Sequence, residues 1–367
     1  MTGQRIDSID IEGYLSIRSA HVELRDLNVL VGANGSGKSN FISALEILGR
    51  IADGDLRWYV GHDRGGAGQL MYRWASDGEI RLHVELGNDA YEAGLVRSAD
   101  DELVFASERL WYEVPGSGRY EASLGRGHQE TRLRKAGDVR DFVSAADRAL
   151  DLLGGCRAYH FHDTSHDAPM KRFADEGDNI VLASDAANLA PFLARLRAAE
   201  PNAYRRIVST IQVVAPFFGD FVLEAESPDH MRLRWRQGSR PDAIKSSSLS
   251  DGTLRFICLA TLLLQPDPPQ LVVLDEPELG LHPFAIVMLA EMLRTAAQRC
   301  QVAVATQSVT LMNQFGVGDL LVVDRVEGGS TFTRHDPGRF AGWLADYSLG
   351  ELWEKNLLGG RPARETA

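Results

Sequence analysis

Cysteine is scarce in this chain of 367 residues. The three cysteines, Cys156, Cys258 and Cys300, lie far apart and form no C-x-x-C pair. Disulfide frameworks and zinc sites both depend on sets of cysteines or histidines at characteristic short spacings. The cysteine spacing therefore supports neither a disulfide framework nor a cysteine zinc site, and it predicts three buried free thiols.

Long apolar runs are also missing. The apolar run at Phe256–Leu264 has nine residues, whereas a helix that spans a membrane needs about 20. The N-terminus has no apolar signal core. We therefore expect a cytoplasmic protein without a membrane partner, and its 44% of hydrophobic residues is enough to bury a large core.

Positive charge is in deficit, because 39 Lys and Arg residues face 51 Asp and Glu residues, for a net charge of −12. This balance excludes a general polyanion binder. Local patches remain. Arg232, Arg234 and Arg236 alternate with apolar residues, which predicts three guanidinium groups on one strand face as candidates for contact with DNA or a partner. The alternative is a solvated face. A second basic group could likewise contact DNA or a partner, or form a solvated face; its residues are Arg126, Arg132, Arg134, Lys135 and Arg140.

The most informative stretch is Gly32–Ser39, which reads G-A-N-G-S-G-K-S and matches the phosphate loop pattern G-x-x-x-x-G-K-[ST]. It follows the apolar run Leu27–Val31 and precedes the helical stretch Asn40–Leu48, which is the strand, loop and helix context that the motif requires. In such a loop, backbone N–H groups and a lysine hold the phosphates of a nucleoside triphosphate. The predicted ATP-binding residues are Gly32, Asn34, Gly35, Ser36, Gly37, Lys38, Ser39 and Asn40.

An acidic pair follows a second buried strand. The run Leu271–Leu274 precedes Asp275 and Glu276, so both carboxylates lie at the carboxyl end of a predicted parallel strand, where open α/β sheets bind ligands. We expect Asp275 and the Ser39 hydroxyl to hold Mg²⁺. Glu276 is then the candidate catalytic residue that polarises the attacking water.

Two further polar segments complete the set. Leu249–Thr253 opens a helix at Leu254–Leu264, and its Ser250 and Gly252 could face a phosphate or form an ordinary helix cap. The strand predicted at Gln301–Thr306 ends at Gln307 and Ser308.

These motifs, in this order, resemble the ATP-binding-cassette (ABC) superfamily. The closer resemblance is to the SMC/RecF-like and OLD-like (AAA_21-type) stand-alone predicted ATPases of bacteria. It rests on the residue sequence of Asn34–Asn40, on the run Ile6–Leu15 and on the segment Glu278–Pro283. Other family-like stretches make the resemblance cover nearly the whole chain. They are Tyr159–Thr164, Asn188–Ala190, Leu349–Trp353 and 359–362.

The resemblance implies a head-to-tail homodimer, in which Ser250 and Gly252 of one copy complete the ATP site of the other in trans. It also assigns Gln307 to the switch position beside the γ-phosphate. Relatives usually carry histidine there, and glutamine cannot titrate, so we expect slow hydrolysis. Gln69 is the candidate for the glutamine loop and for an extra Mg²⁺ ligand, with an ordinary flexible loop as the alternative.

The predicted fold is α/β: a P-loop ABC-type ATPase core with a mixed sheet, an antiparallel β subdomain and an inserted helical lobe. No sustained heptad fills the gap between the motifs. We divide the chain into a P-loop part (1–50), an insert (51–240), a signature and Asp-Glu part (241–335) and a helical tail (336–367). The strands, helices and hairpin expected in the insert are Glu79–Leu86, Glu102–Ala106, Arg109–Val114, Val139–Leu153, Ala187–Ala199 and Phe221–Ala225 with Met231–Arg236.

The function predicted from the resemblance is a Mg-ATP-dependent dimeric switch or clamp in DNA maintenance, DNA repair or phage defence. Its partners would be DNA or a separately encoded nuclease or other effector, because too few residues follow Asp324 for a nuclease domain. The alternatives are a nonhydrolytic regulatory scaffold and, less favoured, a transport-coupled ATPase. His160, His162, His166 and Asp163 leave a metal site other than Mg²⁺ open as an alternative to a polar strand face.

Overall fold

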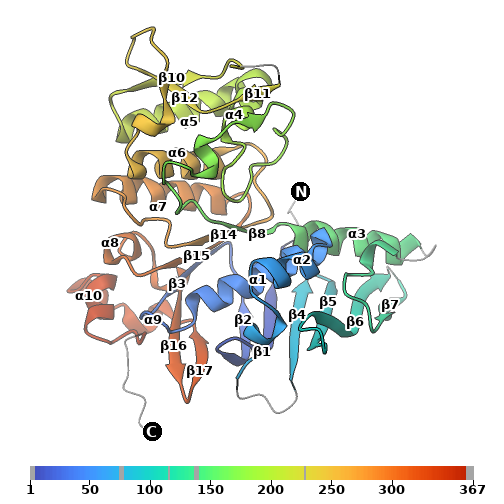
Figure 1. The fold of residues 1–367 in the computed structure, drawn as a ribbon. Helices are drawn as coiled ribbons and strands as arrows, with labels where there is room; N and C mark the ends of the chain where they lie inside the picture. The colour runs from blue at the N-terminus through green and yellow to red at the C-terminus, as the bar shows by residue number, and fades with distance from the viewer. Residues whose placement is uncertain (1–4, 74–77, 115, 136–139, 227–228, 361–367) are drawn as a thin grey trace.

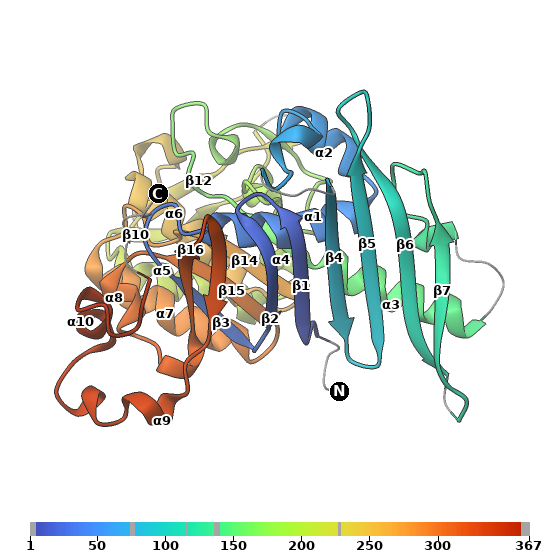
Figure 2. The same ribbon diagram turned by 90° about the horizontal axis from the view of Figure 1, so that it is seen from below.

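The computed structural model describes residues 5–73, 78–114, 116–135, 140–226 and 229–360. Two six-stranded sheets form its framework. A lobe of helices covers one of them, and the view in Figure 2 shows the strands of both sheets side by side. This confirms the predicted α/β fold with a mixed sheet, an antiparallel sheet and a helical lobe.

The mixed sheet is the core of the molecule. Four parallel pairings join β8, β14, β15, β3 and β16, and β17 closes the edge antiparallel to β16. The predicted strands at Leu27–Val31 and Gln301–Thr306 are confirmed with these bounds. In spatial order the strands are β17 (Gly329–Thr333), β16 (Leu320–Val326), β3 (Leu27–Val31), β15 (Gln301–Thr306), β14 (Leu271–Asp275) and β8 (Cys156–Tyr159).

Side-chain alternation along these strands separates two hydrophobic cores. Val272 and Leu274 of β14 face the helical lobe, whereas Leu271 and Val273 face the other core, between the two sheets. Helices α1 (Lys38–Asp53) and α3 (Arg140–Gly154) fill the space between the sheets. The predicted helix at Val139–Leu153 is thus α3, although Val139 itself lies outside the described residues. The remaining helix on this side is α2 (Leu56–His62).

The antiparallel sheet contains the first two strands of the chain as well as the predicted meander. Its order is β2 (Ile17–Glu23), β1 (Ser8–Tyr14), β4 (Glu79–Leu86), β5 (Asp89–Arg97), β6 (Leu103–Val114) and β7 (Gly118–Gly125). The strand expected at Glu79–Leu86 is confirmed.

One prediction for this sheet was wrong: Glu102–Ala106 and Arg109–Val114 are not two strands, because β6 runs without a break from Leu103 to Val114. The polar pair between the two ranges, Ser107 and Glu108, lies within the strand. In the structure, Glu108 is fully buried at an irregularity in the pairing with β7, and its carboxylate accepts hydrogen bonds from the Tyr91 and Thr131 hydroxyls. A satisfied buried carboxylate therefore continues the strand.

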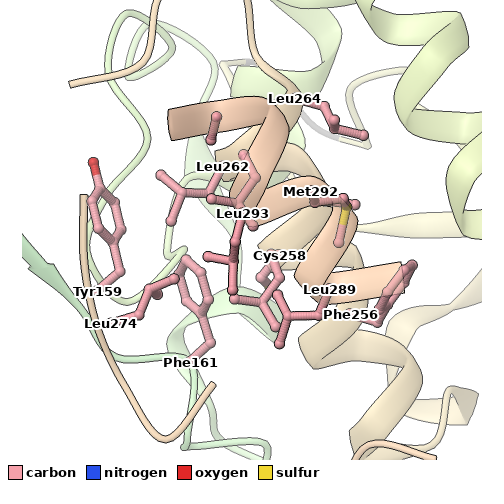
Figure 3. Close-up of a cluster of buried hydrophobic side chains, with 14 of the residues drawn as sticks. Tyr159, Phe161, Phe256, Cys258, Leu262, Leu264, Leu274, Leu289, Met292 and Leu293 are labelled. Carbon is pink, nitrogen blue, oxygen red and sulfur yellow. The ribbon is translucent and has the colours of Figure 1, made fainter. Parts of the chain in front are cut away.

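The helical lobe packs on the face of the core sheet opposite α1. Figure 3 shows its centre, where Phe256, Cys258 and Leu262 of α6 meet Leu289 and Leu293 of α7, with Leu274 of β14 to the left of them. The helices of the lobe are α4 (Leu189–Ala199), α5 (Pro201–Val214), α6 (Asp251–Leu264) and α7 (Pro283–Ala297), and Figure 1 shows them above the sheet. The helix predicted at Ala187–Ala199 thus begins at Leu189.

The hairpin predicted in the lobe is displaced. Phe218–Val222 (β10) pairs with Arg234–Gln237 (β12), and β13 (Ile244–Lys245) extends this small sheet. Met231 belongs instead to β11 (His230–Met231), which pairs with β9 (Ala174–Asp175). The chain therefore changes partner between Met231 and Arg234, which alternation alone does not reveal.

The four-part division of the chain remains a prediction, but its parts share sheets. Strands β1 and β2 of the P-loop part pair within the antiparallel sheet, and β8 of the insert pairs with β14 of the core. The tail carries α9 (Pro337–Phe340) and α10 (Leu349–Glu354), and α8 (Val309–Met312) follows β15. Within the described part of the chain, no helix combines the length and apolar character needed to cross a membrane.

Candidate nucleotide-binding and catalytic site

The predicted site residues meet at one edge of the core sheet because three parallel strands end there. Asp275 of β14 lies opposite Ala305 of β15, and Thr306 lies opposite Val31 of β3. The chain leaves β3 into the phosphate loop, β14 into Glu276 and β15 into Gln307. Parallel register thus brings three segments that are distant in sequence to one place.

Glycines give the phosphate loop its shape. Gly35 and Gly37 have φ angles of 77° and 114°, which side-chain-bearing residues rarely adopt. Gly37 caps the start of α1, so the loop opens directly into a helix N-terminus. The backbone N–H groups there are suited to an anion.

Lys38 folds back over the loop. Its buried ammonium group donates hydrogen bonds to the carbonyls of Gly32 at 2.8 Å and Ala33 at 3.0 Å. Burial lowers the pKa of Lys38, while three nearby carboxylates act in the opposite direction. Those carboxylates belong to Glu276, Asp275 and Glu278. Lysine and the acidic residues therefore share one electrostatic environment.

Three side chains hold the loop in place: two that sequence reasoning missed, Ser16 and Ser330, and the predicted ligand Asn40. The Ser330 hydroxyl of β17 donates to the Ser36 carbonyl at 2.6 Å and lies 2.6 Å from the Ser16 hydroxyl. The amide of Asn40 donates to Ser16 at 2.6 Å, so this predicted nucleotide ligand is tied to the β1–β2 turn. Ser330 packs so closely against Gly37 that a Cβ at Gly37 would overlap its side chain. The glycine at this position is therefore the one sequence feature that is consistent with this contact.

The acidic pair has unusual geometry. One carboxylate oxygen of Asp275, Oδ1, is buried and has no hydrogen-bond partner among the described residues. Glu276 has a φ angle of 44°, which is uncommon for a non-glycine residue, and its backbone N–H donates to the Ala305 carbonyl at 2.8 Å. Its side chain accepts a hydrogen bond from the Gln307 amide. The two predicted catalytic side chains thus touch.

The donor set at this edge fits Mg²⁺. The unpartnered buried Oδ1 of Asp275 needs a positive partner, and the Ser39 side chain is exposed to solvent. Hydroxyl and carboxylate oxygens are the ligands that this hard cation prefers. Gln69 is also exposed, in a short turn at Ala67–Gln69, and no described hydrogen bond of its side chain connects it to Ser39 or Asp275. Its predicted role remains a prediction.

The signature segment lies beside the loop that follows the acidic pair. The Ser250 hydroxyl caps α6 by accepting a hydrogen bond from the Thr253 N–H at 3.2 Å, and Ser250 is exposed. At Gly252, a Cβ would come within 2.5 Å of the Gly280 carbonyl, so only glycine fits. Sequence reasoning missed Arg255. Its buried guanidinium donates to the carbonyls of Phe161 at 3.0 Å and of His162 at 3.1 Å, and also to that of Leu279.

The histidine-rich segment follows β8 at the same edge. Tyr159 pairs with Leu274, so His160 and His162 continue past the strand end next to Asp275. Burial lowers the pKa of His162, and the nearby Arg255 guanidinium acts in the same direction. His166 instead lies 3.1 Å from Asp167 in an exposed loop. Among the described residues, no three His, Cys, Asp or Glu side chains form a group that could hold a metal ion.

The arginine patch of the lobe is partly neutralised. Arg232 forms two hydrogen bonds with the Glu226 carboxylate, at 2.7 and 2.8 Å, and Arg234 lies 3.2 Å from the same group. Arg236 is exposed. In the second basic group, Arg132 and Arg134 donate to the carbonyls of Leu124 and Ala52. The predicted contact with DNA or a partner remains a prediction for both groups.

A hollow of about 1230 Å³ lies at the opposite edge of the core sheet. Gln270 and Gln301, which line it, precede or begin β14 and β15, so this hollow is at the amino ends of the strands that end at the phosphate loop. Its arginines already have partners: Arg148 lies 2.6 Å from Asp89, Arg5 lies 2.8 Å from Asp26, and Arg299 donates hydrogen bonds to the carbonyls of Leu263 and Gln265. Size alone therefore does not make it the reactive site.

Comparison with solved structures supports the fold. An Smc head bound to the C-winged helix domain of ScpA is 16% identical, with 95% of this chain and 99% of that chain covered and a TM-score of 0.56. A Pyrococcus furiosus Smc head domain with an extended coiled coil, bound to the C-terminal domain of ScpA, is 14% identical over 94% of this chain and 99% of that chain, with the same TM-score of 0.56. These likenesses show a shared fold.

Sequence comparison gives the family. No curated protein matches the chain significantly. The family model described as "AAA ATPase domain" matches residues 5–57, which include the phosphate loop. The model of the AAA_21 family, described as "AAA domain, putative AbiEii toxin, Type IV TA system", matches residues 95–313. Because this second match spans more than half of the 367 residues, the chain belongs to the AAA_21 family of AAA-domain proteins.

Proposed function

We propose that this protein binds Mg-ATP, hydrolyses it slowly and uses the cycle as a dimeric switch or clamp. The observation that carries the proposal is the meeting of Lys38, the unpartnered Asp275 oxygen and the Glu276–Gln307 pair at the edge where the phosphate loop begins. Family membership supports a nucleotide as the ligand.

Each residue has a defined task in this proposal. The N-terminus of α1 and Lys38 bind the β- and γ-phosphates, and Lys38 exchanges its loop carbonyl partners for phosphate oxygens. Glu276 accepts a proton from the attacking water, and the Gln307 amide fixes the orientation of that carboxylate. Mg²⁺, held by Ser39 and Asp275, would neutralise phosphate charge when bound.

The exposed surface next to the signature supports a head-to-tail dimer. Leu279 and Phe284 are 52% and 48% exposed, and Gly280 between them contacts Gly252. No described hydrogen bond joins Ser250 to the phosphate loop of its own chain, which is consistent with action in trans. In the dimer, Ser250 and Gly252 would face the ATP that is bound by the other copy.

A mixing experiment tests the dimer. K38A should lose ATP binding but keep its signature, whereas S250R should bind ATP but present a blocked signature. Each variant alone should be inactive, and a mixture should regain part of the activity because one intact composite site can form. Two results together would refute the dimeric switch: a mixture that is as inactive as its components, and E276Q that sediments as a monomer in the presence of Mg-ATP.

The proposed biological partner is DNA or a separately encoded effector. The description of the AAA_21 family names a toxin–antitoxin system, which favours a defence role over transport. For DNA, the exposed Arg236 is the residue to test. Hydrolysis that rises with linear duplex DNA at low salt, and rises less in R236E, would support a clamp. Hydrolysis indifferent to DNA would favour a protein effector. ATP binding without hydrolysis would favour the nonhydrolytic scaffold.

A further inference from the structure

A third carboxylate, Glu278, belongs to the site without having a part in the mechanism above. It lies in the turn after Glu276, and only 8% of its surface is exposed. One of its oxygens, Oε2, is buried without a hydrogen-bond partner among the described residues. Carboxylates are rarely buried to this degree unless a specific contact retains them.

That contact is Thr306, the last residue of β15. Its hydroxyl donates to Oε1 of Glu278 at 2.5 Å and accepts a hydrogen bond from the Ser308 N–H at 2.9 Å. Ser308 in turn caps α8 by accepting from the Leu311 N–H at 3.2 Å. The residues on both sides of Gln307 are therefore fixed by one hydroxyl that Glu278 orients.

The catalytic pair depends on this arrangement. The Gln307 amide reaches Glu276, which has an unfavourable backbone conformation and is two residues before Glu278. The turn that contains both acids is closed by hydrogen bonds from the Leu279 N–H to the Glu276 carbonyl and from the Leu281 N–H to the Glu278 carbonyl. Glu278 thus connects to Gln307 both through Thr306 and through the chain.

We propose that Glu278 and Thr306 form a positioning pair that holds Gln307 against Glu276 and thereby sets the rate of ATP hydrolysis. The inference rests on the proposed function and deepens it. In this proposal neither side chain contacts the substrate, and both act through Gln307. The pair also adjoins the dimer face, because Leu279 and Gly280 follow Glu278 directly and Gly280 touches the signature residue Gly252.

The test compares T306V, which removes the hydroxyl at similar size, with T306S, which keeps it. T306V should lower kcat about 10- to 100-fold, the loss expected from a displaced catalytic group, while the Kd for a fluorescent ATP analogue stays within about twofold. T306S should retain most of the rate. T261V is the matched control, because Thr261 is equally buried and donates to the Ile257 carbonyl within α6, away from the site.

Glu278 itself gives the second arm. E278Q keeps a carbonyl oxygen that can accept from Thr306, so it should stay within about fivefold of the unmodified kcat, whereas E278A should match T306V and the double variant should be no slower than either. If T306V fails to fold, the proposal can still be tested with the other two variants, because it requires E278Q and T306S to keep most of the unmodified kcat. Loss of activity in E278Q to the level of E276Q would mean that Glu278 acts directly and would overturn the positioning role.

The two proposals fail in different ways. Normal hydrolysis by the unmodified chain together with normal kcat in T306V would refute the positioning pair alone. An equal drop in T306V and T261V would also refute it, because the loss would then be general. No hydrolysis by the unmodified chain, with ATP bound, would remove both the hydrolytic function and this inference.

Discussion

Gly37→Ala perturbs the phosphate loop at the point where the structure leaves no room. Gly37 has a φ angle of 114°, and a Cβ at this position would overlap the Ser330 hydroxyl and lie 2.8 Å from the Ser330 Cβ. The backbone strain of a non-glycine residue at such an angle costs roughly 2 kcal/mol. Displacing Ser330 adds the loss of its hydrogen bonds to Ser36 and Ser16, at about 1 kcal/mol for both together.

The free energy of unfolding of G37A should therefore fall by about 3 kcal/mol. Gly35→Ala is the matched control, since Gly35 also has a positive φ of 77° but a Cβ there would meet nothing within 4 Å. It should lose only about 1 kcal/mol, from strain alone. The assay is urea denaturation without nucleotide, followed by tryptophan fluorescence.

Ser330→Gly provides the cross-check. It removes the two nearest of the three atoms that the new Cβ would meet and leaves only Ser16 Oγ, at 2.9 Å, so G37A should cost less in the S330G background than in the unmodified chain. Equal losses for G35A and G37A, or strict additivity of G37A and S330G, would show that Ser330 does not constrain the loop and would refute the reasoning.

Three further predictions follow from buried groups. Arg255→Ala should destabilise the protein by about 2 to 4 kcal/mol in urea denaturation, because three carbonyls lose their donor; an effect below 0.5 kcal/mol would contradict this. Burial raises the pKa of Glu278 above 4.5, so this group stabilises the fold most at low pH and loses that contribution as pH rises through the raised value. At pH 7, the free energy of unfolding of E278Q should therefore be larger than that of the unmodified chain in urea denaturation, and this difference should shrink toward pH 4.5. A difference that does not change with pH would refute the raised pKa of Glu278. Burial also raises the pKa of Cys156 to about 12 and that of Cys300 to about 11, so no thiol should react with a water-soluble disulfide reagent at pH 8 until the protein unfolds, when three should react.

The core strands and the acidic pair could be predicted because their signals are local. Leu271–Leu274 is a continuous apolar run that ends at Asp275, and Leu27–Val31 and Gln301–Thr306 are mostly apolar, and such runs become buried parallel strands. The phosphate loop pattern specifies its own backbone, since Gly35 and Gly37 need positive φ.

Contacts between distant segments could not be read in the same way. Ser330 lies 294 positions after Ser36, and nothing in either local sequence indicates that they meet. The continuity of β6 through Glu108 likewise depends on the hydroxyls of Tyr91 and Thr131, which satisfy that buried carboxylate from elsewhere in the chain. The partner change between Met231 and Arg234 likewise depends on β9, which is more than 50 residues earlier.

The most direct test of the account is single-turnover hydrolysis of Mg-ATP by the unmodified chain and by E276Q, with binding of the nucleotide measured in both. The account predicts slow hydrolysis by the unmodified chain and a fall of about 100-fold or more in E276Q at unchanged affinity, because Glu276 is the base at this edge of the sheet. Equal rates in the two proteins would contradict the central claim.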